Sequence, residues 1–109
     1  MDSIMTEATK HFIKEIRESD IYKEYDYQRT RIKKQPELFE KIQDYRQENF
    51  ELQAGAQGDE LFDKIVAFEQ EYEKFRENPL VDDFLRAELA FCRMIQEVNV
   101  QIAEELEFE

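Results

Sequence analysis

Histidine and cysteine, the residue types that most often bind transition metals or act as nucleophiles, occur once each in this sequence, as His11 and Cys92. Glu7 and Glu15 lie one helical turn from His11, but helical di-iron sites use Glu-x-x-His pairs on two helices. A reactive thiol needs a nearby cation and a base, and only Arg93 adjoins Cys92. We therefore predict no metal, cofactor or catalytic residue, with His11 solvated or interfacial and Cys92 a small buried hydrophobe.

Glu88 is the most unusual carboxylate, because it falls on an apolar helical stripe between Phe84, Phe91 and Ile95. Asn99 lies on the same side nearly three turns later. A buried carboxylate needs a partner or a raised pKa. The residues favour a structural polar contact that sets the register and partner choice of packed helices.

The alternative is a small enzyme or ligand-binding bundle. Glu88 would then act as a general acid or base with Tyr72 or Tyr45 in a core pocket. No motif joins these residues, so a non-enzymatic protein is the favoured interpretation.

A cluster of basic residues follows the middle of the predicted second helix, and an acidic stretch ends the chain. No Lys or Arg follows Arg93. Carboxylates at a helix C-terminus oppose the helix dipole. We hypothesise that the acidic end docks near the basic cluster, within or between subunits; the basic residues are Arg29, Arg31, Lys33 and Lys34, and the acidic ones Glu97, Glu104, Glu105, Glu107 and Glu109.

The elements that must position these residues are all helical, since apolar residues recur every three or four positions and no stretch alternates with a period of two. We predict five helices. The first covers residues 3–18, the second runs from 20 to before Pro36, and the third runs from 36 to a loop at 54–58. The fourth begins at 59, and the fifth covers 79–108. Ser19, Asp59 and Asn78 are the expected N-caps, and Pro36 and Pro79 suit first helical positions. The fold class is an all-α bundle of about five helices in a single domain, residues 1–109.

The final helix would be roughly 45 Å long, whereas a compact domain of about 100 residues has a radius of gyration near 13 Å. One copy of the chain cannot cover it, so we predict a homodimer or larger oligomer. The expected interface residues are Phe84, Glu88, Phe91, Ile95, Val98, Asn99 and Ile102.

Composition limits the partners. A net charge of −12 argues against direct binding of nucleic acid or of an anionic membrane surface. One cysteine excludes an internal disulfide, and the sequence shows neither a signal-peptide pattern nor a run long enough to span a membrane. We expect a cytoplasmic protein.

Three segments resemble the YlbF/YmcA family, and its YheA-like members most closely. They are Ile16-x-x-Ser19-x-x-Tyr22-x-x-Tyr25, the run from Pro36 to Ile42 that leads to Tyr45-Arg46, and the run from Asn78 to Glu88. The resemblance implies a small helical bacterial protein that self-associates through long helices. It also implies a non-catalytic regulatory role, with protein partners in RNA processing or in the control of competence, biofilm formation and sporulation.

The chain departs from the better-studied family members in its cysteines. Those members carry additional cysteines that are linked to an iron–sulfur cluster, whereas this chain has only Cys92. The cluster is therefore not carried over to this chain.

Overall fold

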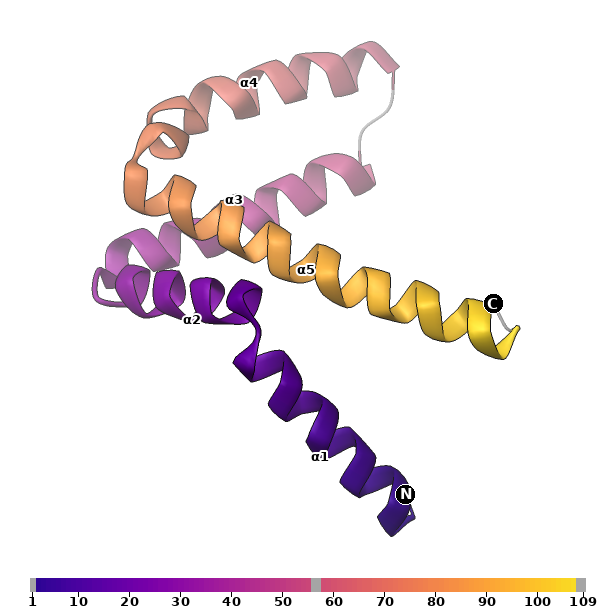
Figure 1. Cartoon of the computed structure of the whole chain (residues 1–109). Helices are drawn as coiled ribbons and strands as arrows, with labels where there is room; N and C mark the ends of the chain where they lie inside the picture. The colour runs from indigo at the N-terminus through magenta and orange to yellow at the C-terminus, as the bar shows by residue number, and fades with distance from the viewer. Residues whose placement is uncertain (1, 56–57, 108–109) are drawn as a thin grey trace.

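The computed structural model describes residues 2–55 and 58–107, which form five helices and no strand. The helices are α1 (Ser3–Glu18), α2 (Asp20–Lys33), α3 (Pro36–Gly55), α4 (Gly58–Glu77) and α5 (Pro79–Leu106) (Figure 1). The predicted all-α class is confirmed, and the starts of α1, α2, α3 and α5 agree with the prediction.

Side-chain caps explain two of these boundaries. The Ser19 hydroxyl oxygen accepts a hydrogen bond from the Tyr22 backbone N–H at 3.2 Å, and the Asn78 side chain accepts one from the Leu80 N–H at 3.0 Å. Each cap satisfies a donor that the first helical turn leaves unpaired.

The start of α4 differs from the prediction. Gly58, with a φ of +64°, already belongs to the helix, so Asp59 lies within its first turn and does not precede it. Residues 56–57 of the predicted 54–58 loop lie outside the described residues.

The core lies where α2, α3, α4 and α5 meet. α2 runs antiparallel to α5, with Tyr22 beside Phe91 at one end and Arg31 beside Asp83 at the other. Each of the four helices contributes at least one side chain that is buried; together these are Ile32, Ile42, Tyr72, Phe75, Val81 and Phe84.

The molecule is more extended than a closed bundle. Its radius of gyration is 18.0 Å, against about 13 Å for a compact chain of this length, and its principal extents are 51 × 36 × 21 Å. α1 and the C-terminal half of α5 leave the core in different directions, as two separate arms (Figure 1). Both arms therefore extend beyond the core that the chain itself provides.

Candidate interaction surface

The first half of the α5 stripe is covered by α2. The Tyr25 ring stacks on Phe91 with centroids 5.0 Å apart and lies 6.2 Å from Phe84, while Tyr22 meets Phe91 edge-on at 5.5 Å. Phe84 is only 1% exposed. The expected placement of Phe84 between chains is thus corrected, because α2 and α3 of the same chain bury it.

The second half of the stripe continues along the same helical face beyond the start of α2. Ile95 and Val98 are partly buried, whereas Ile102 and Leu106 are exposed. Asn99, beside this line, is also exposed. We call Ile95, Val98, Ile102 and Leu106 the distal stripe.

A second apolar face lies on α1. No residue of this helix is buried, although its sequence is strongly amphipathic. Large apolar side chains are exposed along one side of it, and we call three of them the α1 face: Ile4, Met5 and Phe12. The sequence signal for this face was the apolar stripe itself, which does not reveal whether the chain or a partner covers it.

Glu88 has a partner within the chain. The Arg46 guanidinium on α3 donates a hydrogen bond to the Glu88 carboxylate on α5, and the guanidinium carbon of Arg46 lies 5.7 Å from the centre of the Phe84 ring. Both side chains are partly buried. Glu88 therefore ties α3 to α5 in the same chain, and its place in an interface between copies stays a prediction.

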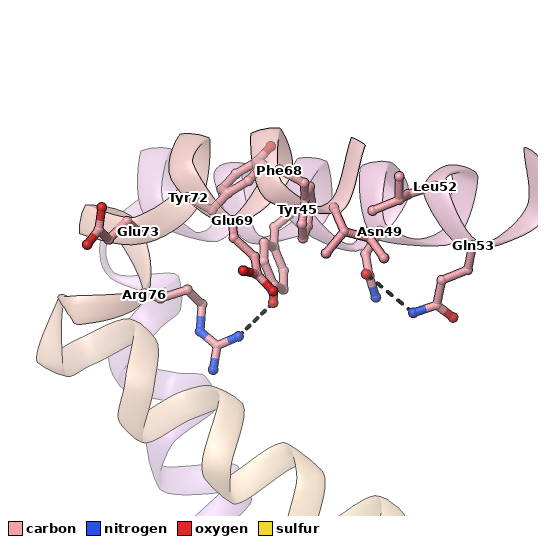
Figure 2. A pocket seen from close by; sticks show the side chains of 10 residues that line it. Tyr45, Asn49, Leu52, Gln53, Phe68, Glu69, Tyr72, Glu73 and Arg76 are labelled. Carbon is pink, nitrogen blue, oxygen red and sulfur yellow. Dashed lines mark hydrogen bonds between the residues drawn. The ribbon is translucent and has the colours of Figure 1, made fainter. Parts of the chain in front are cut away.

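The alternative site that combines Glu88 with core tyrosines does not form. Tyr45 and Tyr72 do line one pocket, of about 480 Å³, between α3 and α4 (Figure 2), but Glu88 is not part of its lining. Burial raises the pKa of the Tyr72 phenol, and the negative charge of Glu48 adds to this shift.

The basic cluster is largely engaged within the chain. Arg29 contacts Asp26 at 2.7 Å, and this hydrogen bond raises the pKa of Arg29. Arg31 lies 3.6 Å from Asp83 of α5, and the Lys33 ammonium lies 5.6 Å from the centre of the Phe39 ring. These contacts join the C-terminal end of α2 to α3 and to the start of α5.

The acidic end of α5 does not reach this cluster within one chain. Because α2 and α5 are antiparallel, the basic end of α2 lies at the start of α5, and Glu104 and Glu105 lie at the far end of the arm (Figure 1). The intramolecular form of the docking hypothesis is therefore wrong, and only the form between subunits remains a proposal. Glu109 lies outside the described residues.

The remaining sequence candidates lie on exposed surfaces of α1 and α5. Cys92 is exposed, which corrects its expected burial, since it lies on the flank of the stripe that α2 leaves open. The His11 ring nitrogen lies 3.9 Å from the Glu15 carboxylate on the exposed surface of α1. Across the described ranges, no three His, Cys, Asp or Glu residues gather as metal ligands. None of the five described helices is both long enough and apolar enough to cross a membrane.

The chain is similar to known proteins of one family. Residues 5–107 match the model of a family described as "Control of competence regulator ComK, YlbF/YmcA". The chain is also similar over 95 residues to a UPF0342 protein of Caldicellulosiruptor bescii, with 27% identity over 85% of this chain and 80% of that relative. No solved structure matches the chain.

Proposed function

Because the chain belongs to the YlbF/YmcA family, whose description names control of the competence regulator ComK, we propose that it is a regulatory protein that works by helical self-association and not by catalysis. In this proposal the distal stripe and the α1 face are covered by a second copy of the chain. The regulated process is RNA processing or developmental control, and the protein acts there in a complex with other proteins. Its location is the cytoplasm.

The observation that carries the proposal is the exposure of two apolar faces on the arms of one chain. Leu106 is 68% exposed and Ile4 is 81% exposed, at the ends of α5 and α1. Exposed apolar residues that line one helical face mark interaction sites, whereas scattered single residues do not. The two arms diverge within one chain, so they do not cover one another (Figure 1).

A second copy of the chain is suited to cover the distal stripe and the α1 face, because each copy supplies both arms. If α1 of one copy packs on the distal stripe of the other, the reverse contact follows from two-fold symmetry and the assembly closes as a dimer. Each buried Ile, Leu, Met or Phe would contribute about 1.5–3 kcal/mol. The acidic end of α5 would then be free to approach the basic cluster of the other copy, a contact that added salt should weaken.

Two neighbouring substitutions on α5 test this proposal. Ile102→Asp places a charge on the distal stripe, while Gln101→Asp adds the same charge one residue away, off the stripe. Burying an unpaired carboxylate is strongly unfavourable. We expect light scattering to give the Ile102→Asp protein a molar mass near that of one chain, 13.3 kDa, with the Gln101→Asp protein unchanged from wild type. Equal masses for the two variants would contradict the proposed interface.

A further inference from the structure

The hairpin of α3 and α4 carries a hollow that is distinct from the distal stripe and the α1 face. Its inner wall is apolar and aromatic, with Tyr45 and Leu52 from α3 and Phe68 and Tyr72 from α4. The three rings pack against one another at centroid distances of 5.1–5.2 Å. Figure 2 shows side chains from both helices along one side of the hairpin. This hollow is the α3–α4 groove.

Exposed apolar side chains extend the groove toward the far end of the hairpin. Ile65 lines the groove, and Phe62 lies one turn before it on α4 and is 67% exposed. Phe62 and Ile65 give α4 an apolar surface that continues past the pocket itself, as a groove for a helix requires.

Carboxylates surround this surface. Glu69 and Glu73 line the groove, and a neighbouring hollow that shares Leu52 and Phe68 is lined by Glu48, Glu51 and Glu71. On both helices acidic residues outnumber basic ones by more than two to one.

The cations among the lining residues are already engaged. Arg76 donates a hydrogen bond to the Tyr45 hydroxyl at 2.6 Å (Figure 2), and Lys64 in the neighbouring hollow pairs with Glu60 at 3.0 Å. Arg76 keeps its positive charge, because the Tyr45 hydroxyl is neutral, but carboxylates still outnumber cations in the lining of both hollows, so the rim presents net negative charge.

This charge disfavours a second copy as the occupant. Two such hairpins would place acidic rims against one another, and the α5 arm has no Lys or Arg after Arg93. The α1 arm balances Lys10, Lys14 and Arg17 with its own carboxylates and brings no excess of positive charge. Charge complementarity thus points to a basic partner from another protein.

We propose that the α3–α4 groove binds an amphipathic helix of a second protein, with apolar anchors on one face and Lys or Arg along their flanks. The apolar anchors would cover Phe62, Ile65 and Phe68, and the cations would meet Glu69 and Glu73. The site lies on different helices from the self-association surface, so the two proposals succeed or fail separately.

A labelled designed peptide tests the proposal by fluorescence anisotropy against the full chain. The probe is a helix with Leu at i, i+3, i+4 and i+7 and Lys on the flanks. One comparison peptide replaces every Lys by Glu, and another scrambles the order of the same residues. We expect saturable binding of the Lys peptide, and binding at least roughly 10-fold weaker for the Glu and scrambled peptides.

Variants locate the binding. Phe62→Ser and Ile65→Ser should each weaken binding of the Lys peptide roughly 10-fold. The double variant Glu69→Gln/Glu73→Gln should weaken it roughly 3-fold, and the affinity of this variant should depend less on salt concentration than that of wild type. Leu89→Ser, at an exposed apolar position of α5 outside the distal stripe, should leave it unchanged. Phe62 is exposed, so its replacement preserves the fold even if that of Ile65 does not.

Three results would overturn the proposal. The scrambled peptide could bind as tightly as the Lys peptide, which would indicate charge attraction alone. The Phe62→Ser protein could bind the probe as tightly as wild type. A peptide of residues 3–18 of this chain could displace the Lys peptide and bind the Phe62→Ser protein more weakly than wild type, which would identify a second copy as the occupant of the groove.

Discussion

The Arg46 guanidinium donates a hydrogen bond to the Glu88 carboxylate and lies over the Phe84 ring, so one side chain joins an ion pair to the aromatic core. This contact links α3 to α5 across 42 positions of sequence. From its place at the edge of the core, it holds the packing of the two helices together.

We expect Arg46→Ala and Glu88→Ala to lower the free energy of unfolding by about 1 kcal/mol each, because both side chains are partly solvated and the ion pair is screened. The double variant should lose less than the sum of the two. Urea denaturation of the four proteins measures this coupling, and strictly additive losses would show that the two side chains do not interact.

Phe84 and Phe62 provide a matched comparison of core and surface. Phe84→Ala should lower the free energy of unfolding by about 3–5 kcal/mol, since the ring is buried among α2, α3 and α5. Phe62→Ala should change it by about 0.5 kcal/mol or less, because that ring is exposed. Similar losses in thermal or urea unfolding would contradict the assignment of Phe84 to the core.

Tyr72 should make the protein sensitive to alkaline pH. Its folded-state pKa is raised above the ordinary value of 10.0, so the unfolded chain loses this proton at a lower pH than the folded chain does. The stabilisation is therefore complete below pH 10 and is lost as the pH rises above it. Tyr72→Phe should reduce this alkaline loss of stability in urea unfolding measured from pH 8 to 11.

Tyr27→Phe is the control for this prediction, because the Tyr27 ring is 57% exposed. It should leave the pH dependence of unfolding as it is in wild type. If Tyr72→Phe and Tyr27→Phe proteins show the same pH dependence, burial of the Tyr72 phenol is not the cause.

Local signals in the sequence were sufficient to place most of the helices. Ser19, Asn78 and the prolines at 36 and 79 act within one helical turn, so their effect is independent of distant contacts. The apolar stripe of α5 was equally evident, because its residues recur every three or four positions. Its division into a half that α2 covers and a half that is left open was not, because the division depends on where α2 begins in space.

The candidate site was harder to predict for the same reason. Phe84 and Ile102 belong to one stripe and have the same helical phase, yet one is buried and the other is exposed. Glu88 was identified as unusual, but its partner Arg46 lies on another helix and no local pattern connects them. The α3–α4 groove was missed because it joins two helices whose relative packing no spacing reveals.

The solution mass of the wild-type chain tests the central claim most directly. At high micromolar concentration, sedimentation equilibrium should give at least twice the chain mass of 13.3 kDa, because a second copy covers the distal stripe and the α1 face. Dissociation should appear only when the protein is diluted toward low micromolar concentration. A mass of 13.3 kDa throughout this range would contradict self-association and leave the two arms without the partner proposed for them.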